Sequence, residues 1–214
     1  PKGKVISLIG PNGAGKSTVM GMISRLIAHD SGLVDFEGRD IGKWKSKELS
    51  KRLAILTQSN NIQMKLTVRE LVTFGRFPYS GNRVTPEDQK IIDRAIAYME
   101  LEEFQDRFID ELSGGQRQRA LIAMVIAQDT EYVLLDEPTN YLDEEHIAWL
   151  KRYLQEYENA FILISHDIPF LNDVINIVYH MENQELNRYV GDYDHFQEVY
   201  AVKKAQLEAA YRRQ

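Results

Sequence analysis

The sequence predicts an α/β fold with a mainly parallel β-sheet, because short apolar strands and amphipathic helices both occur along it. Val5–Ile9 is short, apolar and rich in β-branched residues, as expected of a buried strand. Residues 132–138 and 160–165 are equally apolar, which favours central strands covered on both faces. Residues 19–27 and 140–158 carry apolar side chains at helical spacing and predict helices that pack on the sheet.

The composition is typical of a soluble globular protein of 214 residues, with 43% hydrophobic and 27% charged residues. A net charge of −6 argues against a basic surface over the whole chain but allows local basic patches. The absence of cysteine excludes disulfides and thiolate metal sites. The longest apolar run, Ala120–Ala127, is too short to cross a bilayer, and no signal-like segment opens the chain, so we expect a cytoplasmic protein.

Gly10–Thr18 matches the phosphate-loop pattern G-x-x-x-x-G-K-[ST]. The stretch lies between the predicted strand Val5–Ile9 and a predicted helix, which is the context that the pattern requires. Its glycines let backbone N–H groups converge on phosphate oxygens. Lys16 reaches the terminal phosphates, and Ser17 offers a hydroxyl to Mg²⁺. The stretch therefore predicts a site for a nucleoside triphosphate.

Polar residues follow several of the predicted strands. Asp136 and Glu137 end an apolar strand, and in phosphate-loop enzymes a carboxylate at this point holds Mg²⁺. Asp136 fits that role, and Glu137 is placed to orient or deprotonate an attacking water. His166 follows another core strand at the same edge of the sheet. Gln58 follows Arg52–Thr57, where spacing alone favours a solvated loop residue. The remaining histidines lack such a placement and are interpreted as surface or packing residues: His29, His146, His180 and His195.

Residues 66–128 have a mostly helical pattern. Thr67 begins one helix with a capping box, and Thr85 caps another that has proline at its first position. Leu112–Gln116 then opens an apolar helix predicted over Arg117–Gln128. Its glycine pair at a helix N-terminus is a plausible second anion site, although Ser-Gly-Gly is also a common loop sequence. Since the chain has one phosphate loop, a nucleotide bound here would be shared with a second copy.

Shorter elements complete the pattern. Residues 33–36, 176–181 and 187–190 predict short strands, and residues 38–45 and 78–82 predict loops.

Taken in order, these motifs resemble the nucleotide-binding domain of ATP-binding cassette (ABC) proteins. The resemblance rests on six features: the phosphate loop, a glutamine loop at Gln58, a signature at Leu112–Gln116, the pair Asp136–Glu137, a D-loop at Asn140–Asp143, and a switch histidine at His166.

The resemblance implies a phosphate-loop NTPase fold. The RecA-like core is expected over residues 1–57 and 130–196, with a helical subdomain inserted over residues 58–129. Residues 1–196 then form a single ABC domain, and residues 197–214 form a tail or linker helix.

The resemblance also implies a head-to-tail homodimer that holds two ATP molecules between the phosphate loop of one copy and the signature of the other. Ser113 and Gly115 would contact the γ-phosphate bound to the partner copy. Glu137 would activate water, and His166 would steady the γ-phosphate. The expected Mg²⁺ ligands are Ser17, Gln58 and Asp136. The expected ATP-binding residues are Gly10, Asn12, Gly13, Gly15, Lys16, Ser17, Thr18, Gln58, Ser113 and Gly115.

The two parts of the chain resemble two different ABC subfamilies. Residues 1 to about 143 resemble the ATPases of bacterial iron–siderophore importers, which act on a membrane permease, here through the region from Gln58 to Tyr79. Residues from about 144 resemble ABC-F proteins, which act on ribosomes. The importer likeness is carried by Leu66–Tyr79 and Leu112–Arg119, and the ABC-F likeness by Phe161–Asp167, Phe170–Leu171 and Arg188–Tyr193.

We therefore expect an importer-type ATPase, with an ABC-F fragment as the alternative. A third interpretation is a recombined or engineered hybrid that binds nucleotide without a coupled partner. The resemblance places an adenine-stacking aromatic residue upstream of the phosphate loop, and the chain begins too late to contain it. We expect weak ATP affinity and little discrimination against GTP for that reason.

Overall fold

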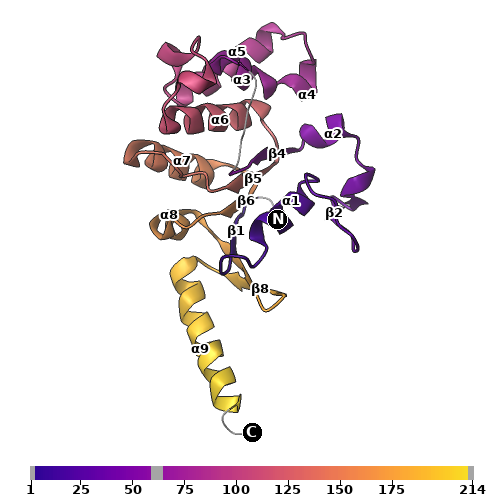
Figure 1. Cartoon of the computed structure of the whole chain (residues 1–214), viewed down its shortest axis with the longest axis vertical. Helices are drawn as coiled ribbons and strands as arrows, with labels where there is room; N and C mark the ends of the chain where they lie inside the picture. The colour runs from indigo at the N-terminus through magenta and orange to yellow at the C-terminus, as the bar shows by residue number, and fades with distance from the viewer. Residues whose placement is uncertain (1–2, 59–64, 212–214) are drawn as a thin grey trace.

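A six-stranded sheet runs through the centre of the computed structural model, which describes residues 3–58 and 65–211 (Figure 1). Five strands are parallel, and β8 pairs with β7 in the antiparallel sense. This confirms the predicted α/β class with a mainly parallel sheet. In sheet order the strands are β4 (Leu53–Leu56), β5 (Tyr132–Asp136), β6 (Ala160–Ile164), β1 (Val5–Ile9), β7 (Ile177–Glu182) and β8 (Glu185–Val190).

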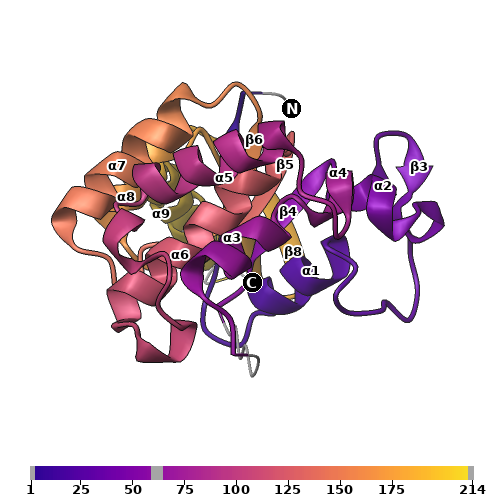
Figure 2. The same ribbon diagram turned by 90° about the horizontal axis from the view of Figure 1, so that it is seen from above.

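Helices cover both faces of this sheet. In Figure 2, α7 and α8 lie on one side of the molecule and α2 and the small β2–β3 hairpin on the other. The helix α9 projects from the body at the bottom of Figure 1. The helices are α1 (Lys16–Ile23), α2 (Ser46–Ser50), α3 (Val68–Phe74), α4 (Phe77–Ser80), α5 (Pro86–Tyr98), α6 (Gly114–Gln128), α7 (Glu144–Glu156), α8 (Ile168–Val174) and α9 (Tyr193–Tyr211). The hairpin pairs β2 (Asp35–Phe36) with β3 (Arg39–Asp40).

Alternation along each strand divides the core into two layers. In β5, Val133 and Leu135 pack into the layer formed with α3, α5, α6, α7 and α8. Leu134, between them, packs into the layer formed with α1 and α2. The period of 2 follows from the pleat of the strand, and both layers are apolar because both faces of the sheet are covered.

Helix starts follow the predicted capping chemistry. Thr67 and Thr85 each accept a hydrogen bond from the backbone three residues on, and each forms a complete capping box. The start predicted for the helix at Arg117 is wrong, because α6 begins at Gly114. Ser113 caps it by accepting from the Gln116 N–H, so the glycine pair belongs to the first turn of the helix.

Several other element predictions need correction. The loop predicted at residues 78–82 contains the end of α4, and residues 38–45 contain β3 and a 3₁₀ turn. Two short helices, α2 and α8, were not predicted, because helices of five and seven residues show too little periodicity. The tail helix expected over residues 197–214 corresponds to α9, which begins earlier, at Tyr193. Of the helical subdomain expected over residues 58–129, residues 59–64 lie outside the described residues.

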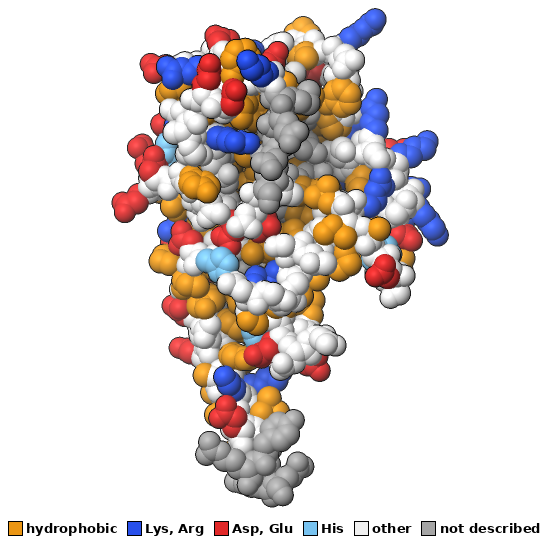
Figure 3. All heavy atoms as spheres, viewed as in Figure 1, with side chains coloured by type: hydrophobic (Ala, Val, Ile, Leu, Met, Phe, Trp, Pro, Cys, Tyr) orange, Lys and Arg blue, Asp and Glu red, His pale blue; other side chains and the backbone are white. Residues whose placement is uncertain are grey.

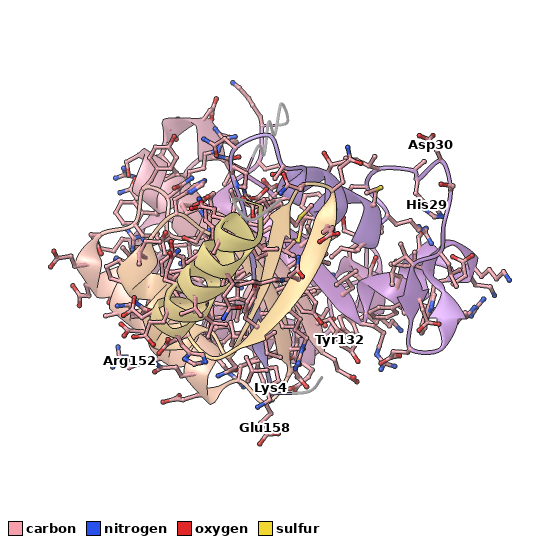
Figure 4. All side chains as sticks on the ribbon, turned by 90° about the horizontal axis from the view of Figure 1, so that it is seen from below. Lys4, His29, Asp30, Tyr132, Arg152 and Glu158 are labelled. Carbon is pink, nitrogen blue, oxygen red and sulfur yellow. The ribbon has the colours of Figure 1, made fainter. Side chains whose placement is uncertain are left out.

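The five parallel strands point the same way, so their amino ends share one edge. Figure 4 shows Lys4, Tyr132 and Glu158 near one another at that edge, and they lie at or just before β1, β5 and β6. The loop that carries His29 and Asp30 lies well apart from them. The carboxyl ends of the same strands therefore meet at the opposite edge, where ligands bind in sheets of this kind.

Surface charge is uneven despite the acidic total. Lys and Arg side chains project from the region of α2 and β3, at the right of Figure 3. The exposed basic residues of that region are Arg39, Lys43, Lys45, Lys47 and Lys51. Among the residues that the structure describes, no helix combines the length and the apolar character needed to span a bilayer.

A buried ion pair joins α4, α5 and the end of α6. The Arg76 Nε donates to Asp88 Oδ1 over 2.8 Å, and Arg76 Nη1 donates to the Ala127 carbonyl over 2.9 Å. Burial would raise the pKa of Asp88, but hydrogen bonds from Ser80, Thr85 and Arg76 outweigh it and hold that pKa well below its usual range. The carboxylate is therefore ionised at neutral pH and ties three helical segments together.

We predict that Asp88→Asn lowers the free energy of unfolding by about 3 kcal/mol, because it leaves a buried guanidinium without its carboxylate. The folded-state pKa is depressed, so this contribution is present above the unfolded pKa and lost as pH falls through the folded one. In urea titrations, the wild type and Asp88→Asn should show the full difference in free energy of unfolding at pH 7. That difference should become smaller only below about pH 4. Asp93→Asn is the control, because Asp93 is 59% exposed in its ion pair with Arg69, and it should cost less than about 1 kcal/mol. Equal effects of the two substitutions would contradict this account.

Candidate functional site

The phosphate loop connects β1 to α1 and is shaped by two glycines. A Cβ atom on Gly10 would lie 2.4 Å from the Met181 carbonyl oxygen, so only glycine lets β7 pack this closely on the loop. Gly15 has a φ of +96° in the left-handed region, where side chains are strained, and it caps α1. The loop backbone is thus curled at the N-terminus of a helix, where N–H groups and the helix dipole favour an anion.

The Lys16 ammonium lies inside this curl. Its Nζ donates to the Gly10 carbonyl over 2.8 Å and to the Pro11 carbonyl over 3.1 Å, and the residue is only 9% exposed. These two carbonyl oxygens are neutral acceptors, and they hold the Lys16 ammonium at the loop. A phosphate offers the same ammonium a charged acceptor, and charge-assisted hydrogen bonds are the stronger kind.

Two carboxylates from the end of β5 face the loop. Asp136 accepts a hydrogen bond from the Ser17 side chain. Glu137 accepts from the His166 backbone N–H at 3.2 Å, and its Oε1 lies 3.3 Å from His166 Nε2. The structure therefore brings together the strand ends that the sequence predicted to share one edge. Glu137 has a φ of +51°, an uncommon backbone for a residue other than glycine, and such conformations cluster at functional sites.

The electrostatics of the site follow from burial. Burial raises the pKa of Asp136, although the Ser17 hydrogen bond and the Lys16 charge oppose it. Burial also raises the pKa of Glu137, opposed by the backbone N–H and charge of His166. The ionised form of each carboxylate is therefore poorly solvated, which favours a nearby cation and makes Glu137 a better proton acceptor than an exposed glutamate.

These groups line a cleft of about 470 Å³. Gln58 lines it from just beyond the end of β4, although spacing alone favours a solvated loop residue. His166 is at the mouth, with its side chain 68% exposed. The lining residues are Asn12, Gly13, Gly15, Lys16, Ser17, Thr18, Gln58, Asp136, Glu137, Ile164 and His166.

The donor set fits Mg²⁺. The Ser17 hydroxyl and the Asp136 carboxylate are in contact, and Gln58 adds an amide oxygen to the same cleft. These are hard oxygen ligands, the kind that Mg²⁺ takes beside substrate phosphates.

Ser113 and Gly115 do not line this cleft; they lie at the start of α6. There the D-loop packs directly on the helix. A Cβ atom on Gly115 would lie 2.7 Å from the Tyr141 carbonyl oxygen, and one on Gly114 would lie 3.2 Å from the Tyr141 ring. The signature and the D-loop therefore form one surface, separate from the cleft within a single copy.

Sequence reasoning missed part of this surface. His146 was interpreted as a surface or packing residue, and it is indeed only 7% exposed. Its ring, however, contacts Arg119 of α6 and Asp143 of the D-loop. The spacing of Asp143 and His146 was a local signal for a helix cap, but nothing local pointed to Arg119.

Comparisons with known proteins place these features in a family. The sequence model described as "ABC transporter" matches residues 1–140. The petrobactin import ATP-binding protein YclP of Bacillus subtilis (strain 168) is 50% identical over 186 residues, which cover 85% of this chain and 74% of that protein. The chain belongs to the ABC ATPase family, and it is an ATP-binding enzyme that hydrolyses ATP.

Two further matches extend the comparison. The uncharacterized ABC transporter ATP-binding protein YfmM of the same organism is 44% identical over 240 residues, covering 100% of this chain and 46% of that protein. The dimeric structure of a post-hydrolysis state of the ATP-binding cassette MJ0796, bound to ADP and Pi, superposes with a TM-score of 0.76 at 27% identity. That match covers 89% of this chain and 86% of the other.

These matches do not support the two other interpretations of the sequence, an ABC-F fragment and a hybrid chain. None of the proteins named above is described as acting on ribosomes, so the ABC-F alternative has no support. Nor do the matches show a recombined or engineered origin.

We predict that Lys16→Ala weakens Mg-ATP binding by roughly 10- to 100-fold, because a charge-assisted hydrogen bond is worth about 1.5–3 kcal/mol. Calorimetric titration measures the affinity, and circular dichroism checks that the fold persists. Lys90→Ala on α5 is the control, since its side chain is 70% exposed, and it should bind as the wild type does. Unchanged affinity in Lys16→Ala would overturn the placement of the phosphates.

Proposed function

We propose that this chain is the ATPase subunit of an iron–siderophore importer, and that it hydrolyses Mg-ATP in a head-to-tail pair of copies. The observation that carries the proposal is the cleft at the carboxyl edge of the sheet, where Lys16, Asp136, Glu137 and His166 meet around a curled phosphate loop. The importer assignment is supported by the similarity to YclP, described as a petrobactin import protein.

The phosphate loop binds the triphosphate in this proposal. Lys16 donates to the β- and γ-phosphates, and the backbone N–H groups from Gly13 to Thr18 surround them. Ser17, Gln58 and Asp136 hold Mg²⁺, which neutralises charge on the phosphate oxygens when bound. The contact already present between Ser17 and Asp136 supports this ligand set.

Glu137 is the residue proposed to act on water. Its carboxylate orients the attacking water and accepts a proton as the oxygen bonds to the γ-phosphorus and the bond to ADP breaks. Its raised pKa supports this role, because a base is most effective when its pKa lies closer to the working pH. His166, in contact with Glu137 and largely exposed at the mouth, donates to the γ-phosphate oxygens.

The pairing of two copies is supported by the separation, within one copy, of the signature residues from the phosphate-loop cleft. Ser113 and Gly115 lie outside the cleft of their own chain, at a capped helix N-terminus suited to an anion. We propose that they contact the γ-phosphate held by the partner. The dimeric MJ0796 cassette provides a related precedent.

The permease surface is proposed around α3 and α4. Phe74 and Phe77 are 44% and 51% exposed and border a groove of about 280 Å³. Exposed aromatic side chains of this kind are enriched at protein interfaces. Of the expected region from Gln58 to Tyr79, residues 59–64 lie outside the described part of the chain. In this proposal the subunit is cytoplasmic and bound to the inner face of the membrane through the permease.

We predict that Glu137→Gln binds ATP with normal affinity and loses at least about 99% of turnover, since acid–base groups contribute about 10²–10⁴-fold. The variant should accumulate an ATP-bound dimer on size-exclusion chromatography, because the nucleotide between the copies is no longer consumed. Wild-type hydrolysis should rise more steeply than linearly with protein concentration. Glu131→Gln, at the opposite end of the same strand, should retain turnover. Retained turnover in Glu137→Gln would assign the role to another group, with His166 the first to test.

The permease contact gives a separate prediction. Phe77→Ala should weaken retention of the chain by immobilised permease subunits of a petrobactin importer at least tenfold, while hydrolysis by the free chain stays unchanged. Tyr98→Ala is the matched control, because Tyr98 is 45% exposed but lies on α5, outside the groove. If the wild-type chain hydrolyses ATP but no such permease retains it, the importer assignment fails and the ATPase assignment stands.

A further inference from the structure

The segment that follows Glu137 lies along the first two turns of α6. Figure 1 shows α6 and α7 side by side, and the segment from residue 138 to residue 146 runs from just after β5 into the first turn of α7. It contacts α6 through Tyr141, Pro138 and His146. Each contact joins a residue close in sequence to Glu137 with one close to Ser113.

The first contact is Tyr141 on the glycine pair. Tyr141 has a φ of +63° and is 79% exposed, an unusual combination for a large aromatic residue. Its carbonyl oxygen and ring lie so close to Gly115 and Gly114 that a Cβ on either would meet them at 2.7 and 3.2 Å. The close approach fixes the D-loop on the helix N-terminus.

The second contact is a hydrogen bond one turn further along α6. Gln118 Nε2 donates to the Pro138 carbonyl over 3.1 Å. Pro138 directly follows Glu137, so this bond restrains the backbone next to the carboxylate.

The third contact passes through His146. Arg119 Nη1 lies 3.0 Å from His146 Nε2, and because guanidinium can only donate, Nε2 is the acceptor. The other ring nitrogen, Nδ1, then carries the proton and donates to Asp143 Oδ1 over 2.6 Å. Arg119 also donates to the Met99 carbonyl over 2.8 Å, at the end of α5. The His146 ring thus bridges the helical region and the D-loop.

We propose that His146 is a positioning residue for hydrolysis: it couples α6, which carries the signature, to the segment that carries Glu137. The inference rests on the proposed function, in which the partner's ATP contacts Ser113. When that contact draws α6 toward the nucleotide, the Arg119–His146–Asp143 bridge and the Gln118–Pro138 bond carry the segment with it. Glu137 then reaches its working position only when the partner's nucleotide is engaged.

The chemistry of the residue makes the role specific. An imidazole presents one acceptor and one donor at opposite ends of a rigid ring, which matches Arg119 on one side and Asp143 on the other. Leucine fills a similar volume and supplies neither bond. Glutamine fills it with an amide oxygen that accepts from Arg119.

The test is ATP hydrolysis and Mg-ATP affinity in His146→Leu and His146→Gln, with His180→Leu as control. His180 is equally buried, 7% exposed, but lies on β7 among Phe196 and Tyr200. We expect His146→Leu to lower kcat at least tenfold with the Kd for Mg-ATP within twofold. His146→Gln should recover most of the lost kcat, and His180→Leu should keep it.

A kcat in His146→Leu equal to that of the wild type would overturn the inference, as would a loss that His146→Gln fails to rescue. If His146→Leu does not fold, Gln118→Leu removes the second contact instead and should give the same separation of kcat from Kd. An unchanged kcat there would also overturn it. A wild-type chain without turnover would instead refute the proposed function, so the two failures are distinguishable.

Discussion

One buried ammonium and two buried carboxylates at the carboxyl edge of the sheet set the requirements for the rest of the structure. Lys16 is held by loop carbonyls, and Asp136 and Glu137 have pKa values raised by burial. Charges in such a place are costly unless partners are supplied. The fold supplies partners for the two carboxylates through the Ser17 hydroxyl and the His166 backbone N–H. The charges that these groups leave unbalanced suit the phosphates and the cation of a magnesium nucleotide.

The parallel sheet is what allows these charges to meet. Parallel strands end at a common edge, so β1, β5 and β6 deliver the loop, the carboxylates and the histidine to one place. Two apolar layers hold the strands in register, and the close approach of Gly10 to Met181 presses the loop against β7. A rigid, close-packed sheet keeps the polar groups from relaxing toward solvent.

A second surface is built on α6 and serves a different purpose. The signature turn, the D-loop and the Arg119–His146–Asp143 bridge are joined by hydrogen bonds and close backbone contact. The bonds reach the residue next to Glu137, so this surface is mechanically connected to the cleft although it lies outside it. In the proposed head-to-tail pair, such a connection would let each copy respond to the nucleotide that its partner holds.

The sequence by itself determined the features that depend on local pattern. Apolar runs predicted β1, β5 and β6, and capping boxes located the starts of α3 and α5 because the bonds join residues three apart. The order of the motifs also indicated the cleft residues from Lys16 to His166, because these residues follow predicted strands whose carboxyl ends meet at one edge of the sheet. Tertiary structure alone decided that Tyr141 covers the glycines of α6 and that His146 joins Arg119. Those partners lie more than twenty residues apart in the sequence. Their meeting depends on how α6 and α7 pack on the same face of the sheet, which no local spacing encodes.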